Sequence, residues 1–363
     1  MGPEHREVIE MTPDFEQFKK ALRRDKPDRI PIFETLVGLE IQSQFLGRNV
    51  IESDLSSQVE FWQRAGYDHM PLPVGMMNPG EITKESRIYN VVQQVLTKGK
   101  ADVVIPWNIE ENGIITTEKD FDEFPWDDAS KLDFTKIDQA GSMISEGMKI
   151  VAVSGKIFTL TWMLMGFQNF AMSLTLQQEL TEKVFQRVGE IQLEAVKRLV
   201  DFESVGALLV ADDLCYGSGP LINPKLVRRY VFPWYEAMAA FCREHDLLYI
   251  FHSDGNIWSF MNDLIALGFD AVNPIDPTCM DIKEVKEKAG RDIGLIGNVS
   301  TDLLATGSEE EVRELTKWLI KEIGPGGGYA LGSGNSVTNW SKFENYQAMR
   351  NTALSLGTYP LSL

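Results

Sequence analysis

The chain has 363 residues, of which 44% are hydrophobic, 10% aromatic and 24% charged, a composition that excludes disordered and fibrous proteins and is typical of a globular chain with a sizeable core. Its 35 basic and 53 acidic residues give a formal net charge of -18. A chain this acidic repels nucleic-acid phosphates and anionic lipid, so we expect neither as a partner.

The cysteines and the start of the chain predict a reducing compartment. Cys215, Cys242 and Cys279 lie far apart, and their odd number and lack of paired spacing do not fit a disulfide framework. The first residues are polar, and no apolar run approaches the roughly 18 residues of a membrane span. We therefore expect a cytoplasmic protein without a leader or a membrane anchor.

Short apolar runs alternate with longer amphipathic segments along the chain. The apolar runs predict strands at residues 29–33, 67–72, 149–153, 206–210, 247–251, 270–273, 293–296 and 328–331. The segments between them predict helices at about 180–200, 223–245, 258–267, 282–289, 308–320 and 343–356. Two of these helices have clear start signals, because Asn223 precedes Pro224 as a cap and Ser308 with Glu311 forms a capping box.

This alternation predicts an α/β fold, because strand, helix and strand at this spacing give parallel strands joined by right-handed crossovers. Eight such units predict a closed (β/α)8 TIM barrel, and an open doubly wound sheet is the alternative. We expect one domain over residues 1–363. A predicted β-hairpin breaks the rhythm, so we expect an insertion at about residues 90–134.

Polar residues follow nearly every predicted strand. In a parallel α/β sheet, the chemistry lies at the carboxyl ends of the strands, so these residues are the candidates for a functional site. They are Glu34, Asp212, Asp213, His252, Asp254, Asn273, Asn298 and Asn335. If the barrel is closed, all of them converge on one mouth.

The densest of these groups is His252 with Asp254. Two residues apart at a strand end, their side chains point the same way and suit general acid/base chemistry or half of a metal site. A core histidine beside a helix-capping aspartate is the alternative interpretation. Asp212 and Asp213 are adjacent carboxylates that suit proton transfer or substrate binding, or alternatively loop capping.

The remaining strand-end residues are candidates for substrate binding. Glu34 is a lone carboxylate, for which an exposed surface position is the alternative. Asn273, Asn298 and Asn335 offer amide groups to a ligand, but asparagine is also a common turn residue.

Several segments in the same order resemble the uroporphyrinogen decarboxylase superfamily. They are residues 211–214 (Ala-Asp-Asp-Leu), 219–224, 252–256 (His-Ser-Asp-Gly-Asn), 273–274, 297–299 and 326–329. The resemblance extends from about Phe15 to Met349 and implies a (β/α)8 barrel with its active site at the mouth. The superfamily includes the haem-pathway decarboxylase and methyltransferases that act between corrinoid proteins and acceptors such as coenzyme M.

The chain departs from both branches at informative positions. The decarboxylase has an Arg-Gln-Ala-Gly-Arg signature after its first strand, whereas residues 34–40 here read Glu-Thr-Leu-Val-Gly-Leu-Glu, without arginine. The zinc-dependent thiol methyltransferases resemble the chain more closely. Their His-x-Cys motif corresponds to His252-Ser253-Asp254, and their later cysteine falls near Asn335. The resemblance implies His252 as a zinc ligand, with Asp254 as a substitute oxygen ligand, and a metal-free acid/base pair is the alternative.

These features together predict a methyltransferase that works with a corrinoid protein and a thiol or reduced-folate acceptor. We expect His252, Asp254 and Asp213 to be catalytic, and Glu34, Asp212 and the three asparagines to bind substrate. One alternative is a decarboxylase of a tetrapyrrole. Another is a non-catalytic protein that binds a corrinoid or tetrapyrrole.

Overall fold

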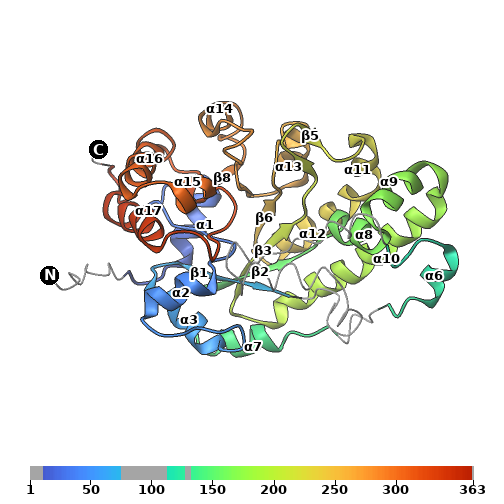
Figure 1. Cartoon of the computed structure of the whole chain (residues 1–363), viewed down its shortest axis with the longest axis horizontal. Coiled ribbons are helices and arrows are strands. Elements are labelled where there is room, and N and C mark those ends of the chain that lie inside the picture. Colours follow the sequence, from blue (N-terminus) through green and yellow to red (C-terminus); the bar gives the residue numbers. More distant parts are fainter. Residues whose placement is uncertain (1–10, 75–112, 127–131, 362–363) are drawn as a thin grey trace.

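The computed structural model describes residues 11–74, 113–126 and 132–361 (Figure 1). Its centre is a parallel sheet with strand order β1-β2-β3-β6-β7-β8-β9. The seven strands are β1 (His69–Pro73), β2 (Lys149–Ser154), β3 (Val205–Ala211), β6 (Leu248–His252), β7 (Ala271–Asn273), β8 (Gly294–Val299) and β9 (Tyr329–Ser333). A short antiparallel pair, β4 (Cys215–Tyr216) with β5 (Gly219–Pro220), follows β3. The predicted α/β class is confirmed.

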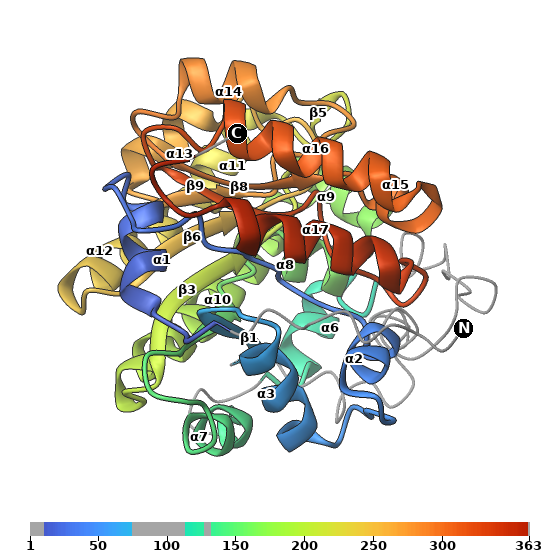
Figure 2. The same ribbon diagram turned by 90° about the vertical axis from the view of Figure 1, so that its left-hand side faces the viewer.

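Helices connect the strands, and most of them pack around the outside of the sheet, as Figures 1 and 2 show. They are α1 (Phe15–Leu22), α2 (Leu39–Leu46), α3 (Leu55–Arg64), α6 (Glu118–Glu123), α7 (Thr135–Gly141), α8 (Phe158–Met165), α9 (Phe167–Leu176), α10 (Gln178–Lys197), α11 (Pro224–Tyr230), α12 (Phe232–Glu244), α13 (Met261–Leu267), α14 (Ile282–Lys288), α15 (Thr301–Thr306), α16 (Glu309–Glu322) and α17 (Phe343–Leu356), with a 3-10 turn at Arg198–Asp201. Helix α17 packs against α2, so elements from the first and last parts of the described chain are in contact.

The sheet curls around an inner core. This inner core consists of Phe15, Phe18, Leu22, Phe33, Val151, Ala207, Leu209, Leu248, Ile250, Ala271, Ile296 and Ala330. Because β2, near one edge of the sheet, and β9, at the other edge, contribute to the same buried cluster, the sheet curls around it. The opposite face of each strand packs against the helices in a second, larger apolar core, which we call the outer core.

The predicted first strand, residues 29–33, is not a regular strand. The expectation of eight strands is therefore wrong, and the main sheet has seven in the described residues. Its backbone is shared between two partners, because Ile30 pairs with Gly357 whereas Phe33 donates to the Leu331 carbonyl at 2.8 Å. Pro31 accepts from Leu331 but has no N–H to donate. The structure therefore has a curled sheet of seven strands with this segment paired to β9 by a single bridge, and it does not confirm a closed eight-stranded barrel.

The predicted helix starts are confirmed, and one predicted helix is divided. Asn223 accepts a hydrogen bond from the Lys225 amide, and Ser308 and Glu311 form the capping box of α16. Residues 223–245 form two helices, α11 and α12, rather than one. Pro233 explains the break, because proline in a helix interior removes a backbone donor and clashes with the preceding turn.

Only part of the predicted insertion can be compared with the structure. The predicted hairpin strands, at residues 91–96 and 102–106, lie outside the described residues. Beyond them, Thr117 and Asp120 form a capping box that starts α6, a helix the sequence did not predict. Among the described helices, none combines the length and apolarity that a bilayer crossing needs.

Candidate active site

The alternation of side chains along the strands decides which predicted residues meet. Leu248 and Ile250 of β6 belong to the inner core, so His252, at the same spacing, faces inward as well. In β7, Ala271 is part of the inner core, and Asn273 therefore faces inward too. The carboxyl ends of these two paired strands place His252 directly beside Asn273.

The same alternation separates the two adjacent aspartates after β3. Leu209 belongs to the inner core and Val210 to the outer core, so Asp212 faces outward and Asp213 inward. Contacts agree with this, because Asp212 accepts a hydrogen bond from Tyr235 of α12 at 2.7 Å. The two carboxylates therefore belong to different environments.

Asp213, His252 and Asp254 come together above the inner core. One ligand atom from each lies within 4.8 Å of the others, a grouping that could hold a metal ion. The Nε2 atom of His252 is 3.8 Å from Oδ1 of Asp254, and the Asp254 amide donates to Asp213 Oδ1 at 3.0 Å. We refer to these three residues as the Asp-His-Asp cluster.

Asn273 orients the imidazole of the cluster. Its Oδ1 atom is 2.6 Å from Nδ1 of His252, and the residue is only 2% exposed. An amide oxygen accepts hydrogen bonds, so Nδ1 carries the proton and Nε2 of a neutral imidazole is left with its lone pair. That lone pair is on the side of Asp254, where a metal or a proton can be bound.

The two carboxylate oxygens of Asp254 have different surroundings. Oδ2 accepts from Nδ2 of Asn335 at 2.7 Å, whereas Oδ1 is inaccessible to solvent and has no hydrogen-bond partner. Burial raises the pKa of Asp254 to about 6, with further increases from the charges of Asp213 and Asp276. A buried carboxylate oxygen without a donor is a position that a cation or a substrate proton can fill.

Asp212 has the contacts of a helix cap. Its carboxylate accepts, at 2.6 to 2.8 Å, the backbone amides of Ile157, Phe158 and Thr159, which are the N-cap residue and the first two residues of α8. The residue is 0% exposed, and burial raises the pKa of its carboxyl. Its contacts therefore hold α8, and the predicted substrate-binding role of Asp212 stays a prediction.

Glu34 and Asn298 also lie outside the Asp-His-Asp cluster. Glu34 is 1% exposed and accepts from the Ser333 amide at 2.7 Å and hydroxyl at 2.5 Å, and burial raises its pKa to about 8. Asn298 donates to the carbonyl of Ile275 at 2.9 Å. The strand-end residues that the structure brings together are thus Asp213, His252, Asp254, Asn273 and Asn335.

The neighbouring thiols are not part of the cluster. Burial raises the pKa of Cys215 to about 12, and it also raises the pKa of Cys279. Without a bound metal, both residues therefore favour the neutral thiol. The donors of the cluster are oxygen and nitrogen atoms.

Asp276 belongs near the cluster but was not predicted from the sequence. Its carboxylate accepts the Gly255 amide at 3.1 Å and the Thr278 amide and hydroxyl, and its charge raises the pKa of Asp254. It lies in the loop three residues beyond β7, where the alternation that identified the strand-end residues no longer applies. An aspartate two residues before a threonine is a turn signal, and it was the only indication in the sequence that Asp276 has a structured position.

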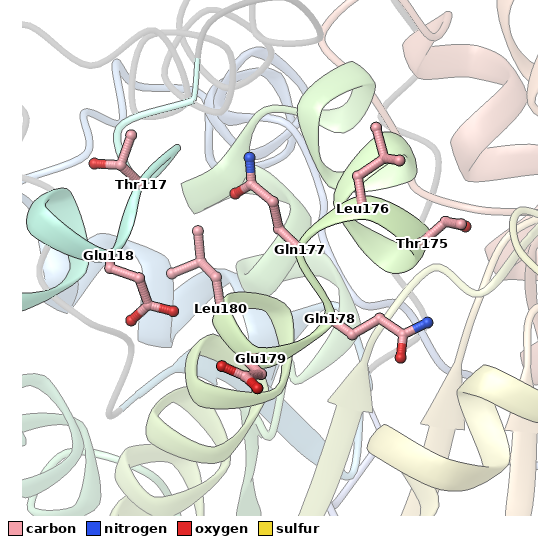
Figure 3. A pocket seen from close by; sticks show the side chains of 8 residues that line it. All are labelled: Thr117, Glu118, Thr175, Leu176, Gln177, Gln178, Glu179 and Leu180. Carbon is pink, nitrogen blue, oxygen red and sulfur yellow. The ribbon is translucent and has the colours of Figure 1, made fainter.

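A separate cavity of about 610 Å³ lies between α6 and the junction of α9 with α10 (Figure 3). Its lining consists of Thr117, Glu118, Thr175, Leu176, Gln177, Gln178, Glu179 and Leu180. None of the cluster residues lines this cavity. It offers neither a histidine nor a thiol, so the Asp-His-Asp cluster is the stronger candidate for chemistry.

Comparisons with known proteins identify a matching family and a solved structure of similar fold. A family model described as uroporphyrinogen decarboxylase (URO-D) matches residues 111–355, which is more than half of the chain. A solved structure named "methyltransferase from Methanosarcina mazei" superposes with a TM-score of 0.64 at 15% identity, and the match covers 93% of this chain and 97% of the other. At this identity, the likeness concerns the fold. A search of curated proteins finds no match.

Proposed function

Because the chain belongs to the uroporphyrinogen decarboxylase (URO-D) family, we propose that it is an enzyme of this family that transfers a methyl group between a corrinoid protein and a thiol or reduced-folate acceptor. The observation that carries the proposal is the inward-facing Asp-His-Asp cluster, with the unpartnered Oδ1 atom of Asp254 beside Nε2 of His252. A structural neighbour that is named a methyltransferase supports it through the shared fold.

The cluster fits a divalent metal ion such as zinc. Imidazole nitrogen and carboxylate oxygen both bind zinc, and catalytic zinc sites commonly have three protein ligands and one open position. The ligands would be Nε2 of His252, Oδ1 of Asp254 and a carboxylate oxygen of Asp213. The unpartnered Asp254 Oδ1 is the observation that fits best, because it lacks the hydrogen bond that a buried oxygen normally has.

Each residue then has a task in methyl transfer. A metal held here would act as a Lewis acid and favour the deprotonated form of a thiol acceptor. The lone pair of the acceptor forms the new bond to the methyl carbon, while the electron pair of the broken bond stays on the donor. The acceptor proton passes to the carboxylate oxygen of Asp213 or Asp254 that does not hold the metal. Asn273 holds the imidazole of His252 in place throughout.

Decarboxylation of a carboxylate-rich tetrapyrrole fits the site less well. Residues 34–40 contain no arginine, and the cluster contributes two carboxylates with a third, Asp276, nearby. Negative charges at the mouth oppose the binding of a substrate with several carboxylates. We therefore treat decarboxylation as an outcome that the experiment must exclude.

The test is to measure loss of methylcobalamin absorbance with thiol and tetrahydrofolate acceptors, together with the metal content of protein purified without chelator. We expect methyl transfer and near-stoichiometric zinc in the wild type. In His252→Ala, we expect the zinc to be lost and the rate to fall by a factor on the order of 100. Asn298→Ala is the matched control for zinc content, because it removes a buried strand-end amide that donates to the Ile275 carbonyl and provides no atom to the cluster.

The other outcomes separate the alternatives. Methyl transfer without metal would replace the zinc site by acid/base chemistry of His252 and Asp254. Turnover of uroporphyrinogen would establish a decarboxylase. Tight corrinoid binding that survives His252→Ala, with no turnover of any acceptor, would establish a binding protein and contradict the proposal.

A further inference from the structure

The loop after β9 contributes to the Asp-His-Asp cluster through a single side chain. Asn335, two residues beyond the end of β9, donates from Nδ2 to Oδ2 of Asp254 at 2.7 Å. That bond restrains the carboxylate of Asp254, whose other oxygen is the unpartnered atom of the site. The position of Asp254 therefore depends on whatever holds the loop of Asn335.

The segment that follows the predicted first strand holds this loop. Glu34 accepts both the amide and the hydroxyl of Ser333, and the Thr35 hydroxyl donates to the Asn335 carbonyl at 3.2 Å. Further along, the Val337 amide donates to the carbonyl of Leu36 at 3.1 Å. Residues 34–36 thus bind the chain at Ser333, Asn335 and Val337, and we call residues 34–36 the strap.

The surroundings of Glu34 suit this task. It is 1% exposed and faces the outer core, where Tyr67 and Tyr346 have their hydroxyls 3.2 Å apart. The charge of Glu34 raises the pKa of both tyrosines, in addition to the larger effect of their burial, so the carboxyl lies near them. The direct partners of the carboxyl are the two groups of Ser333.

We propose that Glu34 is a positioning residue. Through its bonds to Ser333, and together with the rest of the strap, it holds Asn335 against Asp254 and thereby sets the geometry of the Asp-His-Asp cluster. The inference rests on the proposed function for its catalytic meaning, but the linkage from Glu34 to Asn335 is independent of which reaction the cluster performs. A neutral carboxyl and a carboxamide can each accept the Ser333 amide with one atom and donate to the Ser333 hydroxyl oxygen with the other. Glu34→Gln therefore preserves the linkage, whereas Glu34→Ala removes it.

The experiment follows the side-chain amide signals of Asn335 by NMR in protein labelled with ¹⁵N-asparagine, assigned by their loss in Asn335→Asp. In Glu34→Ala, we expect these signals to move toward those of a solvent-exposed asparagine. In Glu34→Gln and in the exposed-surface control Glu146→Ala, we expect them to stay in place. If Glu34→Ala does not fold, Thr35→Val tests the same linkage and is expected to shift the signals part of the way.

Zinc titration of Glu34→Ala, Asn335→Ala and the double variant provides a second, functional readout. Glu34→Ala and Asn335→Ala are each expected to weaken zinc binding by a factor on the order of 10, and the double variant by no more than either alone. Unchanged Asn335 signals in folded Glu34→Ala and Thr35→Val, or losses that multiply in the double variant, would overturn the inference. A wild type that binds no zinc would contradict the proposed metal site, and the NMR result would still decide the linkage.

Discussion

Asn273 shows how one buried amide can control the tautomer of a histidine. Its bond to Nδ1 of His252 selects the tautomer that leaves Nε2 with its lone pair, and groups behind a metal-binding histidine commonly contribute a factor of about 10 to 100 in metal affinity. We therefore expect Asn273→Ala to weaken zinc binding about 10-fold while the fold is retained, as measured by isothermal titration. Asn298→Ala, at the end of the next strand, should leave the affinity unchanged. Equal effects of the two substitutions would contradict an orienting role for Asn273.

At the scale of elements, the start of α8 depends on a residue that is distant in sequence. Ile157 is the first residue before α8 and provides no side-chain cap, and Asp212 fills that place from the end of β3. A carboxylate at a helix N-terminus also interacts favourably with the helix dipole. The contacts of Asp212 therefore join α8 to the strand that presents Asp213.

Asp212→Ala and Asp213→Ala are expected to affect different properties, stability and zinc binding respectively, although the residues are neighbours. The first leaves three buried amides and the Tyr235 hydroxyl without their acceptor, so the free energy of unfolding should fall by about 3 to 5 kcal/mol. The second should change it by less than about 1 kcal/mol and instead reduce zinc binding. Urea unfolding and zinc titration of both variants measure this. A stable Asp212→Ala protein would contradict the capping role.

The same elements show how far sequence reasoning reaches. Local signals, such as the Asn223 cap, the capping box at Ser308 and the apolar runs of seven strands, act over a few residues and were identified correctly. The predicted strand at 29–33 is shared between Gly357 and Leu331, more than 290 positions along the chain, and no local pattern indicates such a division. The break in the helix at Pro233 could have been predicted, because proline at that point is incompatible with a continuous helix.

At the scale of the whole molecule, the curled sheet determines which strand-end residues converge. The spacing of His252 and Asp254 predicted their proximity, because alternation along a strand is a local rule. The different environments of Asp212 and Asp213 depend on which face of β3 is the inside, and that is known only once the sheet has curled. Likewise, the burial of Glu34 follows from its contacts with Ser333, 299 residues away.

The burial of Glu34 makes global stability depend on pH. Its pKa is raised from 4.5 to about 8 in the folded protein, mainly by burial, so between these values the native state holds a proton that the unfolded state has lost. Rising pH therefore favours unfolding, by about 1.4 kcal/mol per pH unit from this group. The stability that the neutral carboxyl contributes is complete below pH 4.5 and decreases until about pH 8.

Glu34→Gln isolates this contribution, because glutamine has no proton to lose and retains the bonds to Ser333. We expect the difference in unfolding free energy between wild type and Glu34→Gln to change by about 1.4 kcal/mol per pH unit across the window, in favour of the variant as the pH rises. Urea unfolding at several pH values measures it, and contributions from other groups cancel in the difference. A difference independent of pH would mean that Glu34 is ionised in the folded protein. The strap would then hold a buried charge next to Tyr67 and Tyr346, and Glu34→Gln would no longer be a faithful substitute for the native carboxyl.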